Sequence, residues 1–146
     1  MNKYKSMIAV GLWLLLSLNA NAAGLKDAAE IRAFTDQIMA QVGSNDLGAA
    51  FDLIEQHSVV EAAAVEAMSV KAVEQRELLS KRIGAPIGSS FIGMKTAGDS
   101  LLRMQYLEKT PKHALLWTFY FYQTPEGWLL STWSRDEQYE QLFMLG

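Results

Sequence analysis

The chain has 146 residues, with 13 Lys or Arg, 16 Asp or Glu, a net charge of −3 at pH 7 and no cysteine. The lack of cysteine excludes disulfides, thiolate nucleophiles and zinc–thiolate sites. The acidic balance, with Lys81-Arg82 as the longest basic run after the first residues, argues against nucleic acid as a partner. The length fits one domain that holds its core by packing alone.

The first 22 residues have the three parts of a secretory signal peptide. Lys3 and Lys5 give a basic start, residues 7–18 form an uncharged and mostly apolar run, and residues 20–22 offer an Ala-x-Ala cleavage site. The run is shorter than the roughly 20 apolar residues that span a bilayer. We therefore expect cleavage after Ala22 and a periplasmic protein, with an uncleaved membrane anchor as the alternative. Residues 23–146 would carry a net charge of −5, which disfavours an anionic membrane surface after cleavage.

Two helices are predicted in the first part of the mature chain. The first covers residues 25–43, and Gly43 is placed to end it. The second extends to about Gln56, with Ser44 or Asn45 as its N-cap. The apolar residues that should face the core are Ile31, Phe34, Ile38, Val42, Leu47, Phe51 and Ile54.

A third and longer helix is predicted over residues 59–83, which are rich in alanine and contain no glycine. Ser58 and Glu61 have the spacing of a capping box at its start. Gly84 and Pro86 break the helix. Its apolar stripe consists of Val65, Met68, Ala72, Leu79 and Ile83.

After Gly88 the chain changes to short β-branched and aromatic runs separated by turn residues. Strands are predicted over residues 90–96, 100–108, 113–123 and 128–136, with a short helix over residues 137–144. Helices followed by an antiparallel meander indicate an α+β fold. The third strand carries large side chains on both faces. One face should therefore meet the helices, and the other should meet a curled part of the sheet, a ligand, another subunit or solvent.

Several C-terminal motifs are similar to those of the nuclear transport factor 2-like superfamily, also called the cystatin-like roll, and in detail to its exported bacterial members. They are GDSL at residues 98–101, YLEK at 106–109, WTFYFY at 117–122 and GW at 127–128, with Asp136, Leu142 and Phe143 at the end. The likeness is good from about residue 80 onwards and loose before it. It implies a single domain over residues 23–146, with three N-terminal helices packed on a curved antiparallel sheet of about four strands and a short C-terminal helix. The superfamily contains isomerases, dehydratases and binding modules, so the fold does not decide the function.

The chain contains no short catalytic or metal-binding motif, and we predict neither a cofactor nor a metal. His57 and His113 lack a sequence-adjacent carboxylate that would orient either ring as a base. The tyrosine and acid patterns of superfamily members that resemble ketosteroid isomerase do not map onto this chain. Asp99, Glu108 and His113 are the residues near the strands that an acid–base role would require.

Six strand residues are the candidates for ligand binding. Arg103 would fix an anionic group if it points inward and would cover aromatic neighbours if it points outward. The surplus of aromatic side chains favours a non-catalytic periplasmic module for an apolar or amphipathic small molecule, or for a protein partner. A small lyase or isomerase and a structural homodimer without ligand are the alternatives. The six candidates are Arg103, Tyr106, Trp117, Tyr120, Tyr122 and Trp133.

Overall fold

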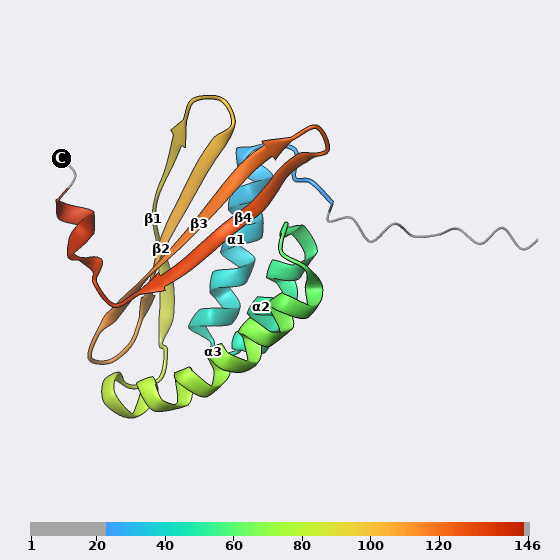
Figure 1. Cartoon of the computed structure of the whole chain (residues 1–146). Helices are drawn as coiled ribbons and strands as arrows, with labels where there is room; N and C mark the ends of the chain where they lie inside the picture. The colour runs from blue at the N-terminus through green and yellow to red at the C-terminus, as the bar shows by residue number, and fades with distance from the viewer. Residues whose placement is uncertain (1–22, 145–146) are drawn as a thin grey trace, which may run out of the picture.

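The computed structural model describes residues 23–144 and has three helices followed by four strands and a terminal 3-10 helix (Figure 1). The α+β class predicted from the sequence is confirmed. The predicted signal peptide, residues 1–22, lies outside the described residues. The elements are α1 (Ala28–Gly43), α2 (Leu47–His57), α3 (Ala62–Ile83), β1 (Gly88–Ala97), β2 (Leu101–Lys109), β3 (Ala114–Thr124), β4 (Gly127–Asp136) and η1 (Tyr139–Phe143).

The four strands form one antiparallel sheet in the order β1-β2-β3-β4. Each strand begins and ends within two residues of its predicted range. The pairing shifts between Phe91 and Gly93 in β1 and between Tyr120 and Phe121 in β3. Such shifts bend and twist the strands locally, so they contribute to the curvature of the sheet.

Helices α1 and α2 pack on one face of the sheet, which we call the inner face (Figure 1). Phe119 and Phe121 of β3 lie fully buried at its centre. Burial of two such large rings contributes strongly to the stability of the core. The helix residues buried against this face include all those predicted: Ile31, Phe34, Ile38, Val42, Leu47, Phe51 and Ile54.

The opposite, outer face of the sheet is partly covered. Tyr120 and Tyr122 are 41% and 49% exposed there, whereas Leu116 and Thr118 on the same face are buried. The 3-10 helix η1 contacts β3. The closing helix predicted over residues 137–144 is therefore present as a 3-10 segment at one end of β3.

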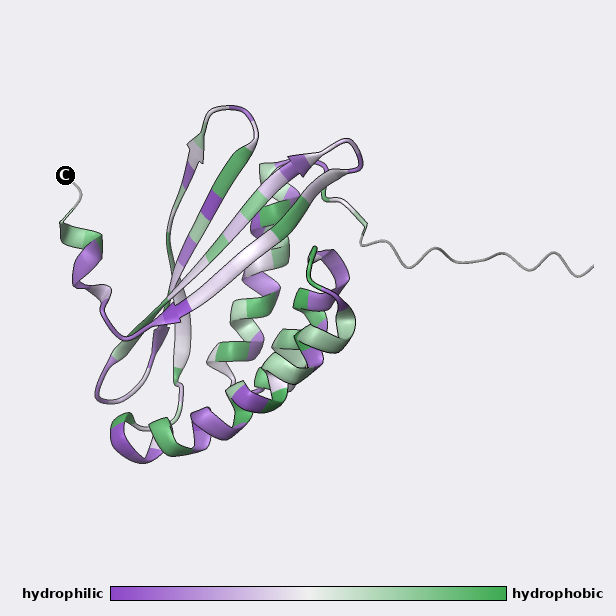
Figure 2. Cartoon of the chain, in the orientation of Figure 1, coloured by the Kyte–Doolittle hydropathy of each residue, from purple (hydrophilic) through white to green (hydrophobic). Residues whose placement is uncertain are grey.

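Helix α3 packs against α2 and reaches the end of the sheet where β4 finishes (Figure 1). Of its 22 residues only Val65, Arg76 and Ile83 are buried. Met68, a member of the predicted stripe, is 48% exposed, so that part of the prediction is wrong. Figure 2 shows hydrophobic and hydrophilic residues alternating along this helix. Over residues 23–144, no helix is both long and apolar enough for a membrane crossing.

The start of α2 differs from the prediction. Its N-cap is Asp46, whose carboxylate accepts a hydrogen bond from the backbone N–H of Ala49 at 3.0 Å. Asn45 instead takes a left-handed conformation with φ of 64°, which asparagine adopts more readily than most residues. The N-cap prediction of Ser44 or Asn45 is therefore wrong by one or two positions.

The predicted capping box at the start of α3 does not form. The Ser58 hydroxyl accepts a hydrogen bond from the backbone N–H of Val60, and the Glu61 side chain makes no capping bond. The backbone N–H of Val59 donates to the carbonyl of Leu130 on β4 at 3.0 Å. This pairing with the sheet edge holds residues 58 and 59 extended, so the helix begins at Ala62.

Candidate functional site

The structure separates the six candidate residues into two groups. Tyr106, Trp117 and Trp133 belong to the inner face, where Tyr106 and Trp117 are each 2% exposed and Trp133 is partly buried. Arg103, Tyr120 and Tyr122 belong to the outer face. Trp117 therefore does not share a surface with Tyr120 and Tyr122.

Arg103 and Tyr120 of the outer-face group line a hollow of about 250 Å³. Arg103 and Tyr120 are direct partners in the β2–β3 register, and Tyr122 pairs with Leu101 beside them. Of the two orientations considered for Arg103, the structure has the outward one. No side chain that lines this hollow offers a buried polar group, so it lacks the fixed donors of a specific binding site.

Tyr106 takes part in a polar contact between β2 and α1. Its hydroxyl donates to the Asp36 carboxylate at 2.7 Å and lies 2.7 Å from the Thr35 hydroxyl. Burial raises the pKa of Tyr106 above its ordinary value, and the hydrogen bond to Asp36 raises it further. Tyr106 thus joins the sheet to α1 as a neutral phenol.

This contact predicts a loss of stability in alkali. The unfolded tyrosine ionises near its ordinary pKa of about 10, while the buried one keeps its proton. Ionisation of Tyr106 should therefore leave the free energy of unfolding unchanged below pH about 10. Above that pH the free energy of unfolding should fall with a slope approaching 1.4 kcal/mol per pH unit. Urea unfolding measured across this range should show the fall in the wild type and in Tyr122→Phe, but a smaller one in Tyr106→Phe. An equal fall in the free energy of unfolding of all three proteins would contradict this prediction.

A polar cluster lies on the inner face beneath α3. Glu108 of β2 is fully buried and forms an ion pair with Arg76 of α3. Its second carboxylate oxygen accepts a hydrogen bond from the Trp117 indole N–H at 2.7 Å. The Glu108 carboxylate is therefore satisfied at both oxygens, and it links α3, β2 and β3.

Arg135 of β4 adds a second guanidinium to this end of the sheet. It pairs with Trp117 in the β3–β4 register and so lies on the same face. Burial lowers the pKa of Arg135, and the positive charge of Arg76 lowers it further. Glu108 and Glu137 oppose the lowering, but less strongly. An anion beside Arg135 would relieve this cost of holding the charge.

The carboxylates closest to Arg135 in the sequence are engaged elsewhere. Asp136 accepts hydrogen bonds from the backbone N–H of Gln138 and from the side-chain amide of Gln141. Glu137 forms an ion pair with Arg82. Within residues 23–144, no carboxylate or carbonyl accepts a hydrogen bond from the Arg135 guanidinium, and no acid forms an ion pair with it. The N–H groups of Arg135 are therefore free to donate to a ligand.

Two adjoining hollows open between α3 and the end of β4, and Gln75 and Arg135 line both of them. We call them together the α3–β4 cleft. They measure about 220 Å³ and about 550 Å³. The smaller is lined by Phe51, Ala72, Gln75, Trp117, Trp133, Ser134 and Arg135. The larger is lined by Gln75, Leu78, Leu79, Arg82, Arg135, Asp136, Glu137 and Gln138.

The three residues considered for acid–base chemistry do not meet. Asp99 lies in the β1–β2 turn, where it accepts from the Ser100 hydroxyl at 2.9 Å. The His113 ring lies 5.1 Å from Tyr139 and 2.9 Å from the Glu137 carbonyl oxygen. Glu108 is the buried partner of Arg76. Among the described residues, no cluster of three His, Cys, Asp or Glu side chains has the arrangement of a metal site.

Comparison with protein-family models, with curated proteins and with solved structures gave no match to this chain.

Sequence reasoning did not assign Arg76 and Arg135 to a site. The alternation of side chains along β4 could have placed Arg135 at the site, because Arg135 shares a face of the strand with Trp133, two residues earlier.

Proposed function

We propose that the chain is an exported, non-catalytic binding module of the nuclear transport factor 2-like kind that holds a small amphipathic anion in the α3–β4 cleft. The leader pattern in residues 1–22 supports export to the periplasm. The confirmed order of three helices and a four-stranded meander is the one that the superfamily resemblance implies.

One observation carries the choice of ligand: Arg135 is a partly buried guanidinium without a counter-ion among the described residues. An arginine offers a planar fork of donors that fits the two oxygens of a carboxylate or the oxygens of a phosphate. The cluster beneath α3 contains two guanidiniums, Arg76 and Arg135, and one buried carboxylate, Glu108. Because Arg76 is paired with Glu108, Arg135 carries the positive charge of this cluster that is left for an anionic ligand.

The wall of the smaller hollow favours an apolar tail on that ligand. Trp133 packs edge-on against Phe51 with ring centroids 6.3 Å apart, and Ala72 of α3 borders the same space. Such rings give a rigid apolar surface next to the charged head of Arg135. An alkyl or aryl carboxylate has the matching chemistry.

Octanoate tests this proposal by calorimetric titration. We expect saturable binding to the wild type and binding weaker by about tenfold or more in Arg135→Gln, because a charge-assisted contact is lost. Octanol, which has the same chain length without the charge, should bind the wild type about as weakly as octanoate binds the variant.

Arg103→Gln is the matched control, because Arg103 lies on the outer face and lines a different hollow. It should bind octanoate as the wild type does. Loss of binding in Arg103→Gln with retention in Arg135→Gln would move the site to the outer face and contradict the proposal. Absence of any saturable heat in the wild type would also contradict it.

A further inference from the structure

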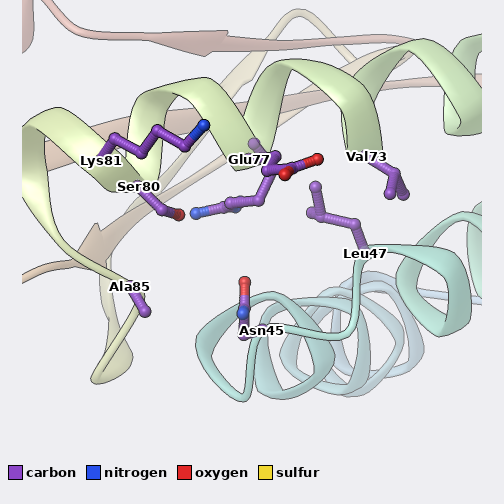
Figure 3. Close-up of a pocket in the computed structure, with 8 residues that line it drawn as sticks. Asn45, Leu47, Val73, Glu77, Ser80, Lys81 and Ala85 are labelled. Atoms are coloured by element: carbon purple, nitrogen blue, oxygen red, sulfur yellow. The ribbon is translucent and has the colours of Figure 1, made fainter.

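Another hollow lies on the other flank of α3, between that helix and the start of α2 (Figure 3). It measures about 530 Å³. Figure 3 shows Ser80 and Lys81 on α3, with Asn45 and Leu47 across from them. The residues that line it are Asn45, Leu47, Val73, Arg76, Glu77, Ser80, Lys81 and Ala85.

Two side chains of this hollow hold buried polar atoms that have no partner within the described structure. The Arg76 side chain is 7% exposed, and one of its terminal nitrogens, Nη1, is bound to Glu108. Its Nε and Nη2 atoms make no hydrogen bond, and neither does the Ser80 hydroxyl four residues later. A buried donor without a partner costs about 1–3 kcal/mol, so such a group is paired in most folded proteins.

The unpaired groups are mainly donors. The Nε and Nη2 of one guanidinium form one edge of its fork, which matches two oxygens of a single anion. Lys81 adds a positive charge at the rim, and Glu77, also at the rim, carries one negative charge. The buried donors therefore decide what fits, and an apolar ligand would leave them unpaired.

We propose that this hollow is a second binding site, which takes a small oxyanion of the carboxylate or phosphate class on Arg76 Nε, Arg76 Nη2 and the Ser80 hydroxyl. Lys81 would attract the anion at the entrance. The site lies across α3 from the α3–β4 cleft and shares no lining residue with it. The two sites therefore use different residues, although the charges of Arg76 and Arg135 affect each other.

Nuclear magnetic resonance of the Arg76 Nε–H group tests the proposal directly. Inorganic phosphate and acetate would be titrated separately at constant ionic strength. We expect a saturable shift of the Arg76 signal with at least one of them, and the tighter of the two identifies the class of anion. A shift that grows linearly with both anions and never saturates would overturn the proposal.

Variants separate this site from unspecific charge effects and from the cleft. Ser80→Ala should weaken anion binding by about fivefold to tenfold, the usual effect of one hydrogen bond. Lys71→Gln is the control, since Lys71 is an exposed lysine of α3 outside the hollow, and it should bind as the wild type does. Equal weakening in both variants would overturn the proposal.

A third variant removes the fork without stranding Glu108. Arg76→Lys keeps a positive charge for Glu108 but has no Nε–Nη2 edge, so phosphate and acetate should no longer saturate it, as followed by the Ser80 backbone amide. Arg135→Gln should leave the Arg76 titration saturable, with only a modest weakening because a neighbouring positive charge is lost. Loss of the Arg76 response in Arg135→Gln would show that the two sites are one, and retained binding in Arg76→Lys would show that the fork is not used.

Discussion

Replacement of Arg76 by methionine should lower the free energy of unfolding by about 3–5 kcal/mol, the cost of leaving a buried charge without its partner. Glu108 is fully buried, and Arg76 is the cation that pairs with it. Domains of this size are stable by about 5–15 kcal/mol, so the variant would lose a large share of its stability. Urea unfolding followed by tryptophan fluorescence measures the difference.

The double variant Arg76→Met, Glu108→Gln is the control. Glutamine removes the negative charge but keeps a carbonyl oxygen that accepts from the Trp117 indole N–H. Replacing both charges of a buried pair is often neutral for stability, so the double variant should recover most of the loss. A double variant as unstable as the single one would show that packing at Arg76, and not the stranded carboxylate, accounts for the effect.

Replacement of Phe119 by alanine should cost about 3–5 kcal/mol, because it removes a large ring and leaves a cavity. Phe119 is fully buried in β3, and its ring lies 6.1 Å from Tyr106 and 6.0 Å from Trp117 between centroids. The neighbouring rings are fixed by hydrogen bonds to Asp36 and Glu108, which limits how far they can move into the space.

Tyr122→Ala is the matched control for this prediction. Tyr122 lies on the same strand but on the outer face, where 49% of it is exposed. Exposed substitutions usually change stability by less than about 0.5 kcal/mol. If the two variants lost similar amounts of stability, the outer face would be covered in solution, as in a homodimer that pairs through it.

The strands were predictable because each lies between turn residues and carries β-branched or aromatic side chains. The turn after β3 has Gly127 with φ of 115°, a conformation that glycine adopts without strain. The starts of α2 and α3 were less predictable. At the start of α3, contacts with Leu130, which is distant in the sequence, hold residues 58 and 59 extended.

The polar cluster has a signal in the sequence. Arg76 falls four residues after Ala72 and three before Leu79, so a charge occupies the apolar stripe of α3. Glu108 continues the alternation of Leu102, Met104 and Tyr106 along β2, so a charge occupies the inner face of the sheet. Opposite charges at two buried positions predict an ion pair, but only the fold shows that they meet.

The aromatic residues were predicted as a group, and their separation into two faces decides which of them border the cleft. Trp117 and Trp133 line the α3–β4 cleft next to Arg135. Tyr120 and Arg103 line the outer hollow. The cleft differs from the outer hollow in one respect that matters for binding. It combines an apolar wall with a partly buried cation that has no counter-ion among the described residues.

A crystal structure of the protein grown with octanoate tests the central proposal most directly. We expect the carboxylate to lie within hydrogen-bonding distance of the Arg135 guanidinium, with the alkyl chain along Trp133 and Phe51. Octanoate bound on the outer face beside Arg103 and Tyr120, with the cleft free of it, would contradict the proposal.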